Sequence, residues 1–237
     1  MMPNDGKRTQ LLLRPYGVQT YLQPRYPELV EDYRTTVEAF NTVVRNEALD
    51  AESLALLLTH AQHRSSIVRG ESADLLGRLA DVFASAREAI TSMLAARAVT
   101  VRASAMTALA RHQLSPLHAV LLPRALNDRS HRIRATAAQN VCGRGLVDLL
   151  PALERATQAE SHEQTREFMT TQLALATHGY IVTPSDDGTS VWVTCRAGSG
   201  TTSSSFEAGE DWETRGQAFL SRNAQAADTR IPESFPD

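Results

Sequence analysis

The chain is poor in several residue types, and each shortage excludes a class of protein. Lysine occurs once, as Lys7, among 237 residues, so that arginine supplies nearly all of the positive charge. The two cysteines, Cys142 and Cys195, are too few for the disulfide framework of a small secreted domain. No run of apolar residues approaches the length of about 18 that a membrane-spanning helix needs. The first residues, with three consecutive leucines followed by Arg-Pro, are too short for a secretory signal. We therefore expect a cytoplasmic protein with reduced thiols and no membrane partner.

Short catalytic and cofactor-binding motifs are also missing. The sequence has no phosphate-binding glycine-rich motif, no H-E-x-x-H, no C-x-x-C and no G-x-S-x-G. His60 and His63 stand three residues apart on one helix, but two ligands do not make a metal site. Cys142 with His112 or His131 would suggest a nucleophile and its base, yet the apolar positions beside Cys142 favour a packed thiol. We expect no enzymatic activity, no cofactor and no metal.

The charge is nearly balanced overall but unevenly distributed. A net charge of −3 and a pI of about 6.2 disfavour a nucleic-acid-binding domain, for which a pI above about 9 is common. Residues 97–134 contain seven arginines and one acid, Asp128, whereas residues 180–237 contain four arginines and nine acids. The excess of arginine over lysine is explained by codon bias in a GC-rich genome, and anion binding is the alternative. The basic middle would attract an acidic partner or the acidic tail.

A helical pattern recurs at a fixed interval along the chain. Four copies, at 66–79, 99–112, 131–144 and 163–176, each carry an arginine at the same place. The spacings between these arginines are 33, 32 and 32 residues. The four are Arg69, Arg102, Arg134 and Arg166. A fixed period of this length indicates a protein built from stacked repeats.

Three positions of each copy form an apolar stripe beside the arginine. They lie one residue before the arginine and three and seven residues after it, which places them on one side of a helix. In the four copies they are Val68, Ser72, Leu76, Val101, Ala105, Leu109, Ile133, Ala137, Val141, Thr165, Met169 and Leu173. Further helices are expected between the copies, at 51–62, 87–97, 116–128 and 146–159. A single helix pair cannot bury its own apolar face, so we expect the pairs to stack.

One stretch of the sequence resembles a particular family of repeats. The segment LLPRALND at 121–128, followed by IRATAA at 133–138, resembles the pattern of HEAT repeats, and Leu149-Leu150-Pro151 begins the next unit similarly. The resemblance covers roughly 50–178 and implies a bend at the first-helix proline. Tetratricopeptide units need an aromatic framework, and only 5% of the chain is aromatic. Ankyrin units need a TPLH-type hairpin, which is absent.

The resemblance also implies a pairing between an acid in the turn and the arginine of the second helix. It implies the pairs Asp128–Arg134 and Glu160–Arg166, because each acid lies six residues before its arginine. The corresponding positions before Arg69 and Arg102 hold His63 and Ala96, so these two arginines depart from the pattern.

The expected fold is mainly α: an α-solenoid of about four HEAT-like helix pairs with a small C-terminal β-hairpin appendage. The expected segments are an irregular arm at 1–26, a leading helix or degenerate repeat at 27–49, repeats at 50–179, a hairpin or meander with a short helix at 180–225, and a disordered tail at 226–237. Phe168 and Leu175 fall on the outward side of the last copy. We expect the hairpin to cover them, with Trp192 as a contributor.

The second helices of HEAT repeats line a concave face, and the resemblance therefore places partner binding there. Polar or charged side chains on the outward side of these helices are the candidate partner-binding residues. They are Asp74, Arg78, Ser104, Thr107, Arg111 and Gln139. The four repeat arginines are expected at the edge of the apolar stripe, where a long stem covers apolar surface.

Three functions fit these features. The first is a non-catalytic scaffold that binds another protein, for example an adaptor, a regulatory subunit or an immunity-type protein in a bacterium. The second is nucleic-acid binding that resembles the HEAT-like glycosylases of alkylated DNA; the acidic pI and the missing aromatic-plus-acid site weaken it. The third is a HEAT-like lyase that attaches bilin chromophores, or another enzyme accessory, which only the shared repeat supports.

Overall fold

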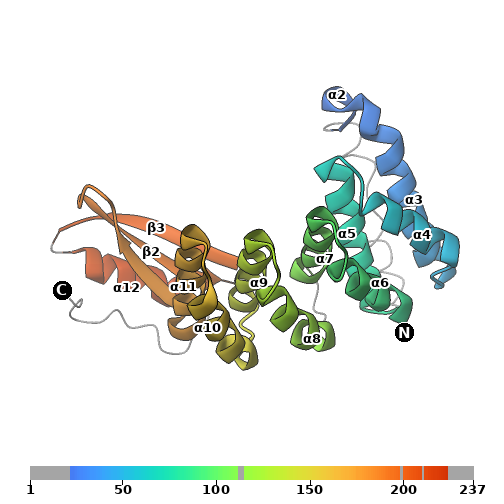
Figure 1. Ribbon diagram of the computed structural model, residues 1–237. Coiled ribbons are helices and arrows are strands. Elements are labelled where there is room, and N and C mark those ends of the chain that lie inside the picture. Colours follow the sequence, from blue (N-terminus) through green and yellow to red (C-terminus); the bar gives the residue numbers. More distant parts are fainter. Residues whose placement is uncertain (1–21, 112–114, 198–199, 210, 224–237) are drawn as a thin grey trace. The chain divides into compact units, whose positions relative to one another are not determined.

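The computed structural model describes residues 22–111, 115–197, 200–209 and 211–223 (Figure 1). The chain forms two compact units, Met1–Leu121 and Leu122–Asp237. The described residues are mainly helical and end in a small three-stranded antiparallel sheet, which confirms the expected fold class. Most of the expected N-terminal arm and the expected disordered tail lie outside the described residues. Within the described ranges, no helix is both long enough and apolar enough to cross a membrane.

The first unit consists of helices that pack in sequence order. They are α2 (Gln23–Arg25), the 3-10 turn η2 (Pro27–Leu29), α3 (Val30–Asn46), α4 (Ala51–His60), α5 (Ser66–Ala80), α6 (Ala84–Leu94) and α7 (Val99–Arg111). Helix α8 (Ser115–Leu126) follows and contains the last residues of this unit and the first of the next. Helix α5 packs against α3, α4, α6 and α7, so that the pairs α4–α5 and α6–α7 stack on one another.

The second unit continues with helices and closes with the sheet. Its elements after α8 are α9 (His131–Gly143), η3 (Val147–Leu149), α10 (Leu150–Ala159), α11 (Glu163–His178), β1 (Tyr180–Pro184), β2 (Ser190–Ala197), β3 (Gly200–Glu207) and α12 (Trp212–Asn223). Helix α11 packs on both α9 and α10. Each unit therefore contains the stacked helix pairs that the period predicts.

The predicted apolar stripe forms the interior of the helix pairs. Eleven of its twelve positions are buried, and Leu173 is half-buried. Val68, Val101 and Ile133, which precede the arginines of the first three copies, are 0%, 8% and 1% exposed. Burying a side chain of this size stabilises the fold by about 1.5–3 kcal/mol. The periodic positions are thus the residues that join neighbouring helices.

Residues at the helix ends supply local caps. The Asp50 carboxylate accepts the backbone N–H of Ser53 at 2.7 Å and caps α4. Gly179 ends α11 in the left-handed conformation with φ of 80°, which costs a glycine little. The described end of the expected arm differs from the prediction. It forms the single turn α2, and Leu22 is buried in a cluster with Leu29 and Val68.

The sheet is an antiparallel meander with the order β1-β2-β3. Strand β2 lies in the centre and pairs with β3 over eight positions, from Ser190 opposite Glu207 to Ala197 opposite Gly200. Helix α12 packs on β2 and β3, as Figure 1 shows. The interior between them contains Val193, Cys195, Phe206, Phe219 and Leu220. A meander followed by a short helix is one of the two forms expected for 180–225, and sheet and helix together form a small sandwich.

The expected cover of α11 by Trp192 is wrong. Phe168 is 37% exposed and Trp192 is 47% exposed, whereas Leu175 is buried at 2%. Side chains alternate between the two faces of a strand, and α12 covers the face that carries Val193. Trp192, the preceding residue, therefore lies on the opposite face, which α12 does not cover. The sheet contacts α11 through β1 and β2, and this contact leaves the two aromatic rings in solvent.

An arginine and a glycine join the sheet to α9. A Cβ atom placed on Gly145, which follows α9, would lie 2.6 Å from Nη1 of Arg196 in β2. Gly145 has a φ of 62°, a conformation that residues with a Cβ adopt at a cost. The guanidinium of Arg196 thus occupies the space that a side chain at position 145 would fill.

Candidate functional site

The repeat arginines hold the turn between the two helices of a pair. Arg69 donates through Nη1 to the carbonyl oxygens of His63 at 2.7 Å and Arg64 at 3.1 Å. Arg102 repeats this with the carbonyls of Ala96 at 3.0 Å and Arg97 at 2.8 Å. These carbonyls belong to the turn that follows the preceding helix and lack helical partners there. The arginines are therefore engaged in local structure rather than offered to a ligand.

Arg134 adds a carboxylate to the same contact. Its Nη1 donates to the Asp128 carbonyl at 2.7 Å, while Nε and Nη2 donate to the two oxygens of Glu160 at 2.6 and 2.5 Å. The Glu160 side chain is fully buried and Arg134 is 18% exposed. The hydrogen bonds that Arg134 donates to Glu160 lower the pKa of Glu160 below its ordinary value and raise the pKa of Arg134.

This geometry corrects one predicted pair. Glu160 bonds to the arginine of the preceding repeat, not to Arg166. Within the described residues, Arg166 is exposed and its guanidinium makes no bond to a turn carbonyl. Asp128 does contact Arg134: its carbonyl accepts from Nη1, and the charge of its carboxylate, which also accepts the backbone N–H of Ser130 at 2.7 Å, contributes to the raised pKa of Arg134. Sequence distance alone did not show that an acid can bridge to the previous repeat.

Two of the candidate partner-binding residues are buried, so the prediction that they face outward is wrong for them. Asp74 is 4% exposed and pairs with Arg78 at 3.1 Å. Ser104 is 3% exposed and donates to the Ala61 carbonyl at 2.8 Å. Neighbouring elements, which the pattern of one helix does not reveal, bury them: α3 flanks α5, and the end of α4 reaches α7. Cys142 is fully buried, in agreement with the packed thiol that its apolar neighbours favoured.

The remaining candidates do not form one site. Thr107 is half-buried and its hydroxyl donates to the Ala103 carbonyl at 3.1 Å. The side chain of Arg111 lies outside the described residues. Gln139 is exposed but belongs to the other unit. Among the candidates of the first unit whose side chains the structure describes, Asp74 and Arg78 are the two that contact each other.

Sequence reasoning missed two residues beside this pair. Tyr33 of α3 is half-buried, and its hydroxyl hydrogen-bonds with Glu71 of α5. Burial, followed by the charges of Glu71 and Asp74, raises the pKa of Tyr33 to about 12. A signal was present, because Tyr33 precedes Arg34 where Val68 precedes Arg69. A tyrosine in place of an aliphatic residue indicates that its hydroxyl finds a partner.

The candidate metal ligands His60 and His63 and the candidate nucleophile Cys142 are used within the fold. No group of three or more potential metal ligands gathers among these residues. His60 contacts the Thr36 hydroxyl at 2.5 Å, and His63 contacts the Asp32 carboxylate at 3.2 Å, so both rings are used between α3 and α4. Burial raises the pKa of the Cys142 thiol, which disfavours the thiolate that a nucleophile requires.

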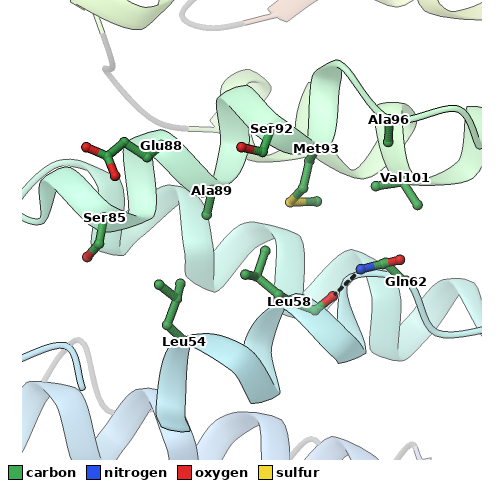
Figure 2. Close-up of a pocket in the computed structure, with 10 residues that line it drawn as sticks. All are labelled: Leu54, Leu58, Gln62, Ser85, Glu88, Ala89, Ser92, Met93, Ala96 and Val101. Carbon is green, nitrogen blue, oxygen red and sulfur yellow. Dashed lines mark hydrogen bonds between the residues drawn. The ribbon is translucent and has the colours of Figure 1, made fainter. Parts of the chain in front are cut away.

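An open apolar groove lies between α4 and α6, the first helices of two successive pairs (Figure 2). Its volume is about 430 Å³. Leu54 and Leu58 line it from α4, while Ala89 and Met93 line it from α6. Figure 2 shows the two leucines and Met93 directed into the space between the helices. The half-buried leucines are neither packed as core nor fully in solvent.

Polar groups surround this apolar floor. They are Gln62, Ser85, Glu88 and Ser92, and Gln62 donates its side-chain N–H to the Leu58 carbonyl at 3.2 Å. Glu88 and Ser92 are exposed. An apolar centre with a polar rim is the arrangement of protein-binding surfaces. None of the candidate residues predicted from the sequence lines this groove.

Comparisons with known proteins give no further guide. No family model, no curated protein and no solved structure matches the chain.

Proposed function

We propose that the chain is a non-catalytic scaffold that binds another protein, and that the α4–α6 groove receives apolar side chains of that partner. The open groove carries this proposal. Its volume of about 430 Å³ has room for one or two large side chains. Grooves between helices commonly bind an amphipathic helix through apolar residues at spacings of about three and four. This places the contact on the first helices rather than on the second helices that the sequence suggested.

The groove favours a protein over the other ligand classes. A small metabolite is held by charged or polar groups that converge on it, whereas here these groups stand on the rim around an apolar floor. The exposed carboxylate of Glu88 repels the phosphates of a nucleic acid. Two arginines of the basic middle segment, Arg102 and Arg134, bond to turn carbonyls instead of facing a ligand. Nucleic-acid binding therefore has less support.

We also propose that the repeats are of the HEAT type. Three features support this assignment. Arginines at a fixed place bond to the turn of their own pair, as Arg69 and Arg102 do. Glu160 in a turn bonds to Arg134 in a second helix. Pro123 lies inside a first helix, α8. A HEAT-type scaffold binds its partners through helix surfaces, which agrees with the proposed use of the groove.

Site-specific crosslinking tests the proposed function. A photo-reactive phenylalanine at Ser92, on the rim of the groove, is expected to capture one protein in cells that express the chain naturally. The same residue at Thr170, exposed on α11, is the control and is expected not to capture it. Mass spectrometry of the crosslinked peptide should identify an amphipathic helix.

A second variant separates groove binding from proximity. Leu58→Asp places a charge on the apolar floor and should abolish the crosslink from Ser92, provided that the helical circular dichroism is unchanged. Equal capture from Ser92 and Thr170, or capture that survives Leu58→Asp, contradicts the proposal. Capture of nucleic acid at Ser92 would support the rival function.

A further inference from the structure

The outer edge of β3 is a second open surface, in the other unit of the chain. Strand β3 lies at one side of the sheet and pairs only with β2. Just beyond the Ser190–Glu207 pair, Ala208 donates its N–H to the Thr189 carbonyl at 2.8 Å. Hydrogen-bonded pairs alternate along an antiparallel ladder. The even-numbered residues of β3 therefore bond to β2, and Thr201, Ser203 and Ser205 direct their backbone groups outward.

These outward groups are available. Within the described ranges, no backbone hydrogen bond joins the outer side of β3 to another segment. Thr201, Ser203 and Ser205 are exposed, and their small side chains leave the edge accessible. An unpaired row of N–H and C=O groups is a template for an added strand.

The opposite edge of the sheet differs. Strand β1 has five residues and ends at Pro184, which has no N–H to donate. Strand β3 has eight residues and contains neither proline nor a charged residue before Glu207. Proline, charge and short length are the usual protections of an edge against pairing. The chain therefore protects the β1 edge and leaves the β3 edge unprotected.

Two arginines lie on one side of α12, and the first of them contacts β3. The guanidinium carbon of Arg215 lies 5.5 Å from the ring centre of Phe206, so this side of α12 faces β3. Arg222 follows seven residues later, about two turns and ~10 Å along the same side of the helix. Both side chains are exposed. Glu207 and Asp211 are acids near Arg215, where the strand leads into the helix: Glu207 follows Phe206, and Arg215 donates its backbone N–H to the Asp211 carbonyl at 3.2 Å.

We propose that the β3 edge binds an extended segment of a partner protein that carries acidic residues. The segment adds a fourth strand through the backbone groups of Thr201, Ser203 and Ser205. Its carboxylates, on the face that α12 covers, meet Arg215 and Arg222, and Arg222 lies further along α12 from Glu207 and Asp211. Main-chain hydrogen bonds supply the affinity, as is usual in strand addition, and the arginines supply the preference for acidic residues. This surface is independent of the α4–α6 groove.

A labelled octapeptide that alternates glutamate with threonine tests the proposal on the full chain. Fluorescence anisotropy should show saturable binding, and the peptide with lysine in place of glutamate should bind at least tenfold more weakly. Arg222→Gln should weaken binding of the acidic peptide several-fold. Equal binding of both peptides, or no binding of the acidic one, overturns the proposal.

Hydrogen exchange of the unmodified chain locates the bound peptide. The amides of Thr201, Ser203 and Ser205 should exchange more slowly when the acidic peptide is present. Those of Thr202 and Ser204, already bonded to β2, should not change. Unchanged exchange at the first three amides overturns the assignment of the edge. A second outcome is that these amides are protected without peptide, that the protection rises with protein concentration, and that sedimentation shows a dimer. In that case a second copy of the chain occupies the edge instead.

Ser203→Pro removes one outward N–H without removing a backbone hydrogen bond to β2. It should weaken peptide binding by at least tenfold relative to Ser203→Ala, which matches it in losing the hydroxyl bond to Thr194 at 2.7 Å. Equal binding by the two variants contradicts the proposal. If the proline variant does not fold, the exchange measurement on the unmodified chain decides.

Discussion

The second helices and the first helices of the pairs use their surfaces in opposite ways. On the second helices, polar groups are matched within the chain: Asp74 with Arg78, and Arg134 with Glu160. Between the first helices α4 and α6, an apolar floor is left uncovered. Residue type alone would have chosen the charged surface as the binding site. The surface of the second helices and the groove between the first helices differ in whether their side chains already have partners within the protein.

The largest expected effect is the loss of the Arg134–Glu160 pair. Glu160→Ala leaves a largely buried guanidinium without its carboxylate, and it should lower the free energy of unfolding by about 3 kcal/mol. Urea denaturation measures this change. Glu154→Ala, at an exposed position of α10, is the control and should change the value by less than about 0.5 kcal/mol. Equal changes in the free energy of unfolding for the two variants would show that the Arg134–Glu160 pair does not stabilise the fold.

The same pair predicts sensitivity to acid. The pKa of Glu160 is lower in the folded chain than its ordinary value of 4.5. The contribution of the pair is therefore present above about pH 4.5 and is lost as the pH falls through the folded pKa. Between pH 6 and pH 3, the unmodified chain should lose more stability than Glu160→Gln does. Parallel pH profiles would contradict the assigned cause.

Asp74→Ala tests the matched surface within the first unit. Removing this buried carboxylate leaves Arg78 without its partner and should cost about 2 kcal/mol, less than at Glu160 because Arg78 is more exposed than Arg134. Thermal and urea unfolding give the value. Thr107→Ala, which removes a half-buried hydroxyl, should cost about 0.5 kcal/mol. If Asp74→Ala leaves the free energy of unfolding unchanged, the surface around Asp74 becomes a candidate binding site again.

Tyr33→Phe should have a smaller effect, about 1 kcal/mol, because it removes one hydrogen bond to Glu71. The folded pKa of Tyr33, about 12, lies above its ordinary value of 10.0. This contribution is therefore complete below pH 10 and is lost as the pH rises through about 12. Ultraviolet absorbance of phenolate should show one tyrosine that titrates late and is absent from the variant. Titration of all tyrosines near pH 10 would exclude the contact.

The smallest change in stability is expected at the groove. Ser92→Trp places a ring on its rim and should alter the free energy of unfolding by less than about 0.5 kcal/mol, since surface positions tolerate substitution. It should nevertheless block capture of the partner at the apolar floor. A destabilisation well above 1 kcal/mol would show that the space is already closed, and the contrast between the two surfaces would fail.

Periodicity was sufficient to predict the helix pairs and their interior. The stripe of Val68, Val101 and Ile133 is buried because a face that repeats every helical turn must lie against neighbours. Asp50 and Gly179 show that capping residues can likewise be recognised from local sequence. The buried stripe and the helix caps each depend on the residues of a single helix, and they can therefore be predicted from the sequence.

The candidate site was harder to predict because it depends on pairs of elements. The burial of Asp74 follows from the position of α3, which no property of α5 reveals. The groove consists of ordinary residues such as Leu54 and Met93, and only the spacing between α4 and α6 makes them a surface. The exposure of Trp192 was mispredicted for a related reason: the third strand and α12 determine which face of the sheet is covered.

Gly145 gives experimental control over the attachment of the sheet. The nearest atom to a new Cβ would be the mobile end of Arg196, so that alanine displaces a flexible group while adding the cost of a positive φ, about 1–2 kcal/mol. Larger side chains at this position would move the guanidinium further. A graded series of substitutions at one residue should therefore loosen the C-terminal module from its helix stepwise. Because neither proposed binding surface is altered, such a series would show whether a partner of the β3 edge requires that module to be held firmly.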